Sequence, residues 1–274
     1  MYAFANAKIN IGLYIVERRE DGYHNIESVF APIPLCDTLE LRLAKKDDSA
    51  CTLFQTGHTL DCKSEDNLVV RVFRALQDEF QLPPVEIHLH KRIPSGAGLG
   101  GGSSDAAEIA KMANEFFRLD LSEKELAARV SRFGADCAFF VANRAAYVTD
   151  IGTELTDFPL QLSDLFLALV KPPIFISTKE AYAGVTPRKP AYDLRESLSR
   201  PVETWRETVV NDFEDSVFPQ YPTVAAIKQT LYDMGAVYAS MSGSGSSVFG
   251  LFRRPVEELS GVFPDCFTFT AALR

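Results

Sequence analysis

The stretch Pro94–Ala107 (PSGAGLGGGSSDAA) constrains the fold more than any other part of the chain. Five of the 16 glycines fall within seven consecutive positions of this stretch. Glycine tolerates positive φ and lets backbone N–H groups approach a ligand closely, and a phosphate is the usual ligand where a helix follows. The alternating run Val85–His90 predicts a half-buried strand before the loop. An apolar helical face over Asp105–Phe117 predicts a helix after it, with Ser103 or Ser104 as N-cap. The arrangement predicts a phosphate cradle, and the alternative is a glycine-rich turn without a ligand.

The loop matches one common nucleotide-binding pattern superficially and does not match another. Gly96, Gly98 and Gly101 satisfy G-x-G-x-x-G, so a dinucleotide-dependent oxidoreductase is an alternative. A central Rossmann strand is buried on both faces, whereas the strand before this loop alternates. The loop also lies far from the first strand, and Asp120, at about the right distance for a ribose ligand, lies between two predicted helices. No Gly-Lys-Ser/Thr ends the loop, so it is not a Walker A motif. The oxidoreductase is therefore the weaker interpretation.

The length, charge and composition of the chain limit the classes of protein to which it can belong. A chain of 274 residues has room for a substantial core and two domains. Its net charge of −9 argues against broad binding to nucleic acids or anionic membranes. Five scattered cysteines and four histidines, without metal-ligand spacing, favour reduced thiols over a zinc site. No apolar run approaches the ~20 residues that span a bilayer, and strand-like sequence at the N-terminus argues against a targeting peptide. We expect a cytoplasmic globular protein.

The pattern along the chain predicts an α+β protein of two domains. The first third is rich in strands, predicted at Ala5–Leu13, Ile26–Ile33 and Thr38–Leu43. Later segments are predicted as follows: helix Asn67–Phe80 with Asp66 as cap, a capping box at Ser122 and Glu125, strands Ala138–Val141 and Ala145–Thr149, strand Leu165–Val170, a helix capped by Ser177, a surface excursion Pro187–Pro201, helix Thr223–Met234, and strands Tyr238–Met241 and Val248–Phe252. The polar segment Thr153–Ser163 is the predicted boundary, which gives domains 1–155 and 156–274.

Three further motifs carry candidate chemistry. Lys8 lies between two asparagines on one strand face, a pattern that suggests a pocket floor, although a strand lysine is more often solvated. Asp136, in Gly-Ala-Asp before an apolar run, can accept a proton from a hydroxyl, but a simple turn explains it equally well. The serine-glycine loop Ser242–Ser247 offers further hydrogen-bond donors for a polyanion. The alternative interpretation of this loop is a flexible turn without a ligand.

Taken in this order, the motifs resemble the GHMP kinase superfamily. The resemblance is carried by AKIN (Ala7–Asn10), the loop Pro94–Ser104 and the loop Ser242–Ser247, and it spans nearly the whole chain. Asp21-Gly22-Tyr23-His24 narrows the match to the branch whose substrate is a cytidine diphosphate derivative of methylerythritol. The resemblance implies ATP-dependent phosphorylation of the 2-hydroxyl of that methylerythritol group, in the non-mevalonate route to isoprenoid precursors. It also implies an N-terminal domain like the second domain of ribosomal protein S5, a ferredoxin-like C-terminal domain, and an active site in the cleft between them.

The resemblance assigns roles to individual residues. Asp136 would be the base and Lys8 its electrostatic partner. Asn10 would touch the substrate near the transfer site, Tyr23 would stack on the cytosine, His24 would bond to the base edge, and Tyr182 would close the aromatic sandwich. The residues implied to bind ATP are Asn67, Lys91, Pro94, Ser95, Gly96, Ala97, Gly98, Leu99, Gly100, Gly101, Gly102, Ser103 and Ser104.

Other members of the superfamily remain alternatives. A homoserine- or mevalonate-type kinase has no use for Tyr23 and His24 beside a pyrimidine, and a non-catalytic nucleotide-binding module has no use for Lys8 and Asp136. Where the family usually has proline, two residues after the aspartate, this chain has Ala138, and we expect a less constrained backbone there. Magnesium is expected to arrive with ATP, without a dedicated protein ligand set. A monomer and a homodimer are both compatible with the sequence.

Overall fold

The chain forms two compact units, each assembled from separate segments. The computed structural model describes residues 1–45, 51–59 and 62–273. Unit 1 comprises Met1–Ala7, Leu35–Ser95 and Gly100–Arg144, and unit 2 comprises Lys8–Pro34, Gly96–Leu99 and Ala145–Arg274. The predicted division into domains 1–155 and 156–274 stays a prediction, because the units interleave along the chain.

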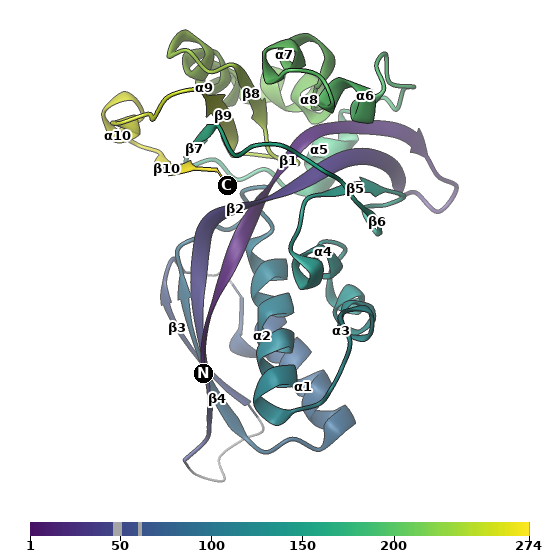
Figure 1. Ribbon diagram of the computed structural model, residues 1–274, viewed down its shortest axis with the longest axis vertical. Helices are drawn as coiled ribbons and strands as arrows, with labels where there is room; N and C mark the ends of the chain where they lie inside the picture. Colours follow the sequence, from purple (N-terminus) through teal and green to yellow (C-terminus); the bar gives the residue numbers. More distant parts are fainter. Residues whose placement is uncertain (46–50, 60–61, 274) are drawn as a thin grey trace. The chain divides into compact units, whose positions relative to one another are not determined.

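Strands and helices come in runs along the chain, and most paired strands are antiparallel, which confirms the predicted α+β class (Figure 1). The strands are β1 (Tyr2–Arg18), β2 (His24–Leu43), β3 (Cys51–Gly57), β4 (Val85–Lys91), β5 (Ala146–Thr149), β6 (Glu154–Asp157), β7 (Phe166–Lys171), β8 (Tyr238–Met241), β9 (Val248–Phe252) and β10 (Phe267–Ala272). The helices are α1 (Leu68–Phe80), α2 (Gly101–Phe117), α3 (Glu123–Val130), α4 (Cys137–Ala142), α5 (Thr178–Ala183), α6 (Leu194–Leu198), α7 (Trp205–Thr208), α8 (Phe213–Gln220), α9 (Pro222–Asp233) and α10 (Leu259–Val262).

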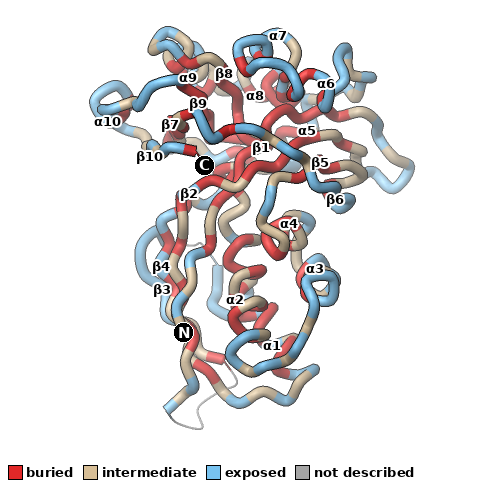
Figure 2. The backbone as a smooth tube through the Cα atoms, in the orientation of Figure 1, coloured by how far each residue is buried: buried red, intermediate tan, exposed pale blue. Residues whose placement is uncertain are grey.

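Unit 1 packs helices against one side of a sheet. In the sheet, β3 runs parallel to β4, and β4 runs antiparallel to β2. Helix α1 packs on α2, and α2 packs on α4. Asn67 begins α1 by accepting a hydrogen bond from the Val69 N–H, and the predicted capping box of Ser122 and Glu125 begins α3. Apolar residues at helical spacing on α1 and α2 are fully buried, as Figure 2 shows in red.

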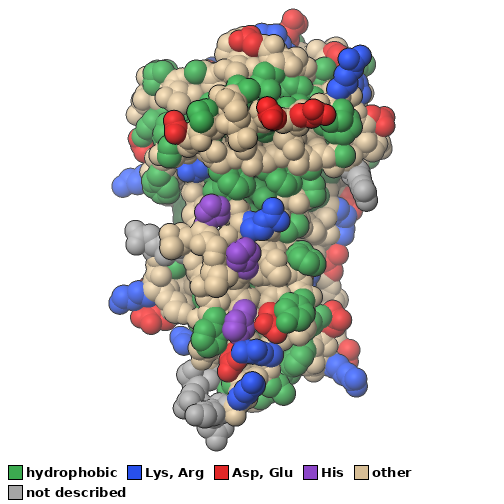
Figure 3. All heavy atoms as spheres, turned by 90° about the vertical axis from the view of Figure 1, so that its left-hand side faces the viewer, with side chains coloured by type: hydrophobic (Ala, Val, Ile, Leu, Met, Phe, Trp, Pro, Cys, Tyr) green, Lys and Arg blue, Asp and Glu red, His purple; other side chains and the backbone are tan. Residues whose placement is uncertain are grey.

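The outer side of the unit 1 sheet carries polar and aromatic side chains. His88 and His90 alternate with buried residues of β4, and the His88 ring stacks on Phe54 of β3 at a centroid distance of 4.7 Å. Figure 3 shows histidine side chains (purple) gathered on this face. The alternation along β4 therefore agrees with the half-buried strand that the sequence predicts.

Unit 2 contains a four-stranded antiparallel sheet in the order β10-β7-β9-β8. Strands β8 and β9 are buried along their whole length (Figure 2), and α9 packs against both of them. The same unit contains the antiparallel pairs β2–β5 and β5–β6. Among the described residues no helix is both long and apolar enough to cross a membrane.

Several predicted elements differ from the structure. The predicted strand Ala138–Val141 is wrong, because these residues belong to helix α4. Helix α2 begins at Gly101 with Gly100 as N-cap, so Ser103 and Ser104 are helical rather than capping residues. Asn67, not Asp66, is the N-cap of α1. The two predicted strands Ile26–Ile33 and Thr38–Leu43 are one strand, β2. The predicted domain boundary Thr153–Ser163 contains β6, and the predicted surface excursion Pro187–Pro201 contains α6.

Candidate active site

The second half of the glycine-rich loop forms the N-terminus of α2 in unit 1. Gly100, the N-cap, adopts φ 70° and ψ 16°, a left-handed conformation that favours glycine. No side chain caps this helix, so no side chain occupies the first-turn N–H groups. Gly102 is exposed, whereas Ser104 is buried. The end of a 17-residue helix therefore presents backbone donors and the positive end of the helix dipole.

The middle of the loop is fixed by hydrogen bonds to its backbone carbonyls within unit 2. The Lys8 N–H donates to the Leu99 carbonyl at 3.0 Å, and the Ser242 hydroxyl donates to the Gly98 carbonyl at 2.9 Å. Gly98 has φ +72°, and a Cβ there would overlap the Ser242 carbonyl oxygen, so only glycine fits. The side chains of Ala97 and Leu99 are buried and anchor the loop. The Gly96–Leu99 segment of the glycine-rich loop thus bonds both to the strand residue Lys8 and to the loop Ser242–Ser247.

Lys8 and Asn10 lie together in the interior of unit 2. The Lys8 ammonium donates to Asn10 Oδ1 at 2.5 Å and lies 4.2 Å from the centroid of the Phe30 ring. Asn10 donates through Nδ2 to the Ser28 hydroxyl at 3.0 Å, and its backbone N–H donates to the Ser242 hydroxyl at 3.2 Å. Both side chains are buried, which excludes a solvated strand face, and their place on a pocket floor stays a prediction.

Asp136 is the N-cap residue of α4 in unit 1 and is half-buried, but its side chain does not cap that helix. The neighbouring Cys137 thiol hydrogen-bonds to Ser103 of the first turn of α2, although burial still raises the pKa of Cys137. A Cβ on Gly134 would lie 3.5 Å from the Ser103 hydroxyl oxygen. The turn that carries Asp136 is therefore packed against the glycine-rich start of α2. Ala138 lies in the first turn of α4 rather than at the start of a strand, a position where proline is tolerated, and the less constrained backbone expected there stays a prediction.

His24 and Tyr182 are stacked in unit 2. Their ring centroids lie 4.6 Å apart with 16° between the ring planes, and Tyr182 also meets Phe213 edge-on at 4.8 Å. Burial, and then the charge of Arg18, lowers the pKa of His24, which favours the neutral imidazole. Tyr23, the preceding residue, is 61% exposed. The structure brings together two of the three residues predicted for the cytosine, and His24 occupies one face of Tyr182.

Asn67 and Lys91 have structural partners in unit 1. The Asn67 Oδ1 accepts from the Val69 N–H at 2.9 Å. The Lys91 ammonium donates to the carboxylates of Asp37 and Asp105. The backbone carbonyl of Lys91 accepts from the His58 N–H at 2.9 Å. That these two residues also contact adenosine stays a prediction.

Sequence reasoning missed the residues that hold the loop Ser242–Ser247. Asn211 Nδ2 donates to the carbonyls of Met241 at 2.7 Å and Gly243 at 2.9 Å. Glu214 Oε1 accepts from the Met241 N–H at 2.9 Å and from the Ser240 hydroxyl at 3.1 Å. Asn211 and Glu214 precede the loop by about 30 residues, and no local pattern marks them. Their only sequence signal is polar residues among apolar ones, which is too common to be specific.

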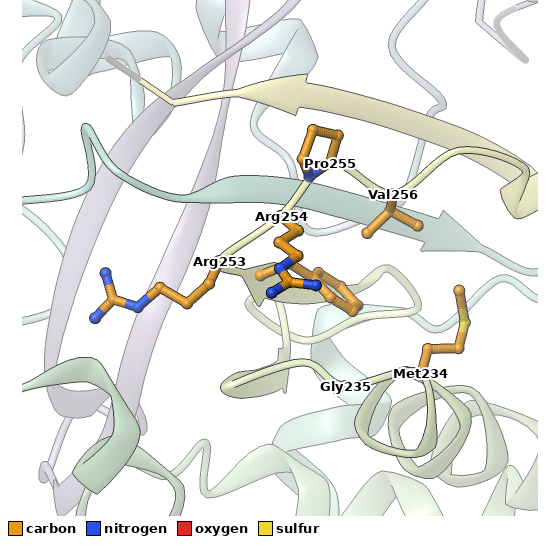
Figure 4. A pocket seen from close by; sticks show the side chains of 7 residues that line it. Met234, Gly235, Arg253, Arg254, Pro255 and Val256 are labelled. Carbon is orange, nitrogen blue, oxygen red and sulfur yellow. The ribbon is translucent and has the colours of Figure 1, made fainter.

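A surface hollow of about 380 Å³ in unit 2 holds none of the predicted site residues (Figure 4). It is lined by Met234, Gly235, Phe252, Arg253, Arg254, Pro255 and Val256. Arg253 points away from the other labelled side chains and pairs with Glu203 at 2.8 Å. The five cysteines are free thiols, and no cluster of three or more potential metal-ligating side chains occurs in the described part of the chain.

Comparison with known proteins agrees with this arrangement of motifs. The family described as GHMP kinases N terminal domain matches residues 67–144, and the family described as GHMP kinases C terminal matches residues 194–263. The chain therefore belongs to the GHMP kinase superfamily. Crystal structures of a homoserine kinase from Cytophaga hutchinsonii and of a mevalonate kinase share the fold, with TM-scores of 0.68 and 0.70 at 16% and 14% identity.

More similar relatives narrow the assignment. The chain is 51% identical to a 4-diphosphocytidyl-2-C-methyl-D-erythritol kinase of Bacteroides thetaiotaomicron, over 97% of this chain and 95% of the relative. The kinase of the same description from Parabacteroides distasonis is 49% identical over the full length of both chains. A crystal structure of 4-(cytidine 5'-diphospho)-2C-methyl-D-erythritol kinase matches with a TM-score of 0.82 at 28% identity and covers 98% of each chain. Within the superfamily, the chain belongs to the family of 4-diphosphocytidyl-2-C-methyl-D-erythritol kinases.

Proposed function

We propose that this chain transfers the γ-phosphoryl group of ATP to the 2-hydroxyl of 4-diphosphocytidyl-2-C-methyl-D-erythritol, a step of the non-mevalonate route to isoprenoid precursors. Family membership at about half identity over the whole chain supports the substrate and the reaction. The observation that carries the proposal within the structure is the packing of the Asp136 turn against the uncapped, glycine-rich start of α2. A phosphate-binding helix end and a carboxylate beside it are what phosphoryl transfer to an alcohol needs.

The glycine-rich loop is proposed to bind the phosphates of ATP. Phosphoryl transfer depends mainly on positioning and charge stabilisation, so preorganised N–H donors lower the barrier. Gly100, Gly101 and Gly102 carry no side chains that would keep phosphate oxygens away from the backbone. Magnesium is proposed to arrive as part of the ATP complex, since Mg²⁺ keeps several waters and is usually bound by substrate phosphates together with one or two carboxylates.

Asp136 is proposed as the base and Lys8 as its electrostatic partner. A carboxylate can accept the proton of the 2-hydroxyl as the oxygen attacks the γ-phosphorus. A lysine ammonium favours the ionised carboxylate and stabilises the negative charge of the transferring group. The hydrogen bond from Lys8 to Asn10 restricts the lysine to few rotamers, which supports a fixed position for this charge.

Tyr23, His24 and Tyr182 are proposed to bind the cytosine. Aromatic rings stack on bases, and a neutral imidazole can exchange hydrogen bonds with the edge of a pyrimidine. Because His24 already covers one face of Tyr182, a base between Tyr23 and Tyr182 must displace His24 or use the other face of Tyr182. In the first case the rings of His24 and Tyr182 separate when the substrate binds, and in the second case their stack persists.

The test of this function compares acceptors in an ADP-release assay. The cytidyl-methylerythritol substrate, mevalonate and homoserine are each supplied with ATP and magnesium. We expect turnover with the cytidyl substrate only, because the other acceptors lack a base for the aromatic residues. No ADP release with the cytidyl substrate, or equal rates with all three acceptors, would exclude the assignment. The cytoplasmic location and the choice between monomer and homodimer stay predictions.

A further inference from the structure

Three charged side chains form a buried cluster in unit 1, beside the glycine-rich loop. Lys91 ends β4, Asp37 lies in β2, and Asp105 is the fifth residue of α2. The Lys91 ammonium donates to Asp37 Oδ2 and, at 2.7 Å, to Asp105 Oδ2. The three side chains are 2%, 0% and 2% exposed, respectively, so solvent screens none of these contacts.

The cluster touches both ends of the loop. Asp37 Oδ1 accepts from the backbone N–H groups of Arg92 at 2.6 Å and Ile93 at 2.8 Å, the first two residues after β4. Asp105 lies in the second turn of the helix that begins where the loop ends. Lys91 bridges the two carboxylates. The residues before the loop and the helix after it are thus both linked to the buried Lys91 ammonium, the former through Asp37 and the latter through Asp105.

The two ends also pack closely around this ammonium group. A Cβ on Gly101, the first residue of α2, would lie 2.9 Å from a methyl carbon of Ile93 and 3.4 Å from Lys91 Nζ. A shift of the helix relative to the strand would therefore break either the contact of Gly101 with Ile93 or the ion pair of Lys91 with Asp105. Close packing and charge-assisted bonds together restrict the spacing between the loop ends.

The charges of the cluster balance when one carboxyl group is protonated. Burial raises the pKa of Asp105 to about 8, against the opposing effect of the Lys91 ammonium. Burial lowers the pKa of Lys91, but the two carboxylates outweigh that effect and raise it. Replacing such buried clusters with apolar residues often leaves stability unchanged or improves it, so stability alone does not account for three charged residues here.

We propose that Asp37, Lys91 and Asp105 are positioning residues, which hold the two ends of the glycine-rich loop at the spacing that binding of the ATP phosphates requires. The proposal rests on the proposed function, in which the loop binds ATP. It assigns Lys91 a role through its side chain that is separate from any contact with adenosine. In this role the cluster acts through the backbone at the two ends of the loop.

The test compares alanine and asparagine at position 105. Asp105→Ala removes the helix end of the bridge, whereas Asp105→Asn keeps an oxygen that accepts from Lys91. The matched control is Glu108→Ala, which removes the surface ion pair of Glu108 with Lys111 on the same helix. For each protein, the Kd of ATP is measured by calorimetry, the KM values of both substrates by ADP release, and the thermal midpoint by circular dichroism.

We expect Asp105→Ala to raise the Kd and KM of ATP at least tenfold and to change the KM of the cytidyl substrate less than threefold. Asp105→Asn should recover most of the ATP affinity, and Glu108→Ala should bind ATP as the unaltered chain does. If Asp105→Ala does not fold, Asp37→Asn tests the strand end of the bridge. Asp37 accepts through both oxygens, from Lys91 and from the Arg92 and Ile93 N–H groups, and asparagine keeps only one acceptor oxygen, so the same selective loss of ATP affinity is expected.

A lower thermal midpoint with unaltered ATP affinity would overturn the proposal, because it would show a structural role only. Equal losses of ATP affinity in Asp105→Asn and Asp105→Ala would also overturn it. The ATP calorimetry needs no cytidyl substrate. A folded, unaltered chain that binds ATP but does not phosphorylate that substrate would therefore refute the proposed function and leave this inference standing.

Discussion

Replacing Asn211 with aspartate removes two hydrogen-bond donors from the loop Ser242–Ser247 at almost constant shape. Asn211 is 3% exposed, and its amide nitrogen donates to the carbonyls of Met241 and Gly243. An ionised aspartate has no hydrogen to donate to these two carbonyls. The bond from the Phe213 N–H to Oδ1, 3.0 Å long, can persist in the variant. Asn211→Asp therefore isolates the two bonds that hold the loop.

The expected loss of stability follows from the two backbone carbonyls that lose the Asn211 donor in the variant. The Met241 carbonyl keeps a bond from the Ser240 hydroxyl at 3.4 Å, so loss of the Asn211 bond there costs about 0.5–1.5 kcal/mol, whereas loss of this donor at the buried Gly243 carbonyl costs about 1–3 kcal/mol. We therefore expect the free energy of unfolding to fall by about 1.5–4.5 kcal/mol, measured by urea denaturation. The KM of ATP should rise as well, because the Ser242 hydroxyl on this loop donates to the carbonyl of Gly98 in the ATP loop.

Asn114→Asp supplies the matched comparison. Asn114 is half-buried on α2 and donates to a single carbonyl, that of Leu121, at 2.9 Å. Its replacement should cost about 1 kcal/mol, because one donor bond is lost where water can reach the carbonyl. A loss for Asn211→Asp no larger than that for Asn114→Asp would refute the reasoning. So would a destabilised Asn211→Asp protein whose KM for ATP matched that of Asn114→Asp.

Three further outcomes are expected. Asp136→Asn should retain ATP binding in calorimetry and lose about 10²–10⁴-fold in turnover, the usual contribution of a general base; a rate within threefold of the unaltered chain would remove Asp136 from that role. Tyr23→Ala should raise the KM of the cytidyl substrate about tenfold, since stacking contributes about 1–3 kcal/mol per base, with little effect on the KM of ATP; an unchanged KM for the cytidyl substrate would contradict the stacking role. Because the pKa of Asp105 rises from an ordinary 3.8 to about 8 in the folded chain, this group's stabilising effect is complete below pH 3.8 and is lost as the pH rises through 8. Between pH 5 and 7 the free energy of unfolding should therefore fall by up to about 1.4 kcal/mol per pH unit more than in Asp105→Asn, and parallel stability curves for the two proteins would exclude the shift.

Much of the fold could be predicted because its signals are local. The capping box of Ser122 and Glu125, the strand before the glycine-rich loop and the strands β8 and β9 depend on residues within a few positions of one another. Helix α4 could not be recognised, because four apolar residues in a row fit a buried strand as well as a helix. The first turn of α2 was missed because glycine is a poor helix former, and tertiary packing overrides that propensity here.

The candidate site likewise combines residues that local motifs indicate with residues that only packing brings there. Lys8, the glycine-rich loop, Asp136 and the Tyr23–His24 pair could be named from motifs. Their supports could not: Asp37 precedes Lys91 by 54 residues, and Asn211 contacts a loop about 30 residues further along the chain. Contacts at such separations depend on how the elements pack, which no pattern within either segment records.

By itself, the sequence determined which chemistry this chain can perform, because a glycine-rich loop, a lysine, a carboxylate and an aromatic pair are properties of residue type and order. Only the tertiary structure decided what holds that chemistry in place. Lys91 illustrates the difference. The resemblance implies that it contacts adenosine, which stays a prediction, and the folded chain shows in addition that its ammonium group lies between two buried carboxylates at the ends of the loop. A buried charge must find its partners wherever the fold brings them, so those partners become visible only once the chain is folded.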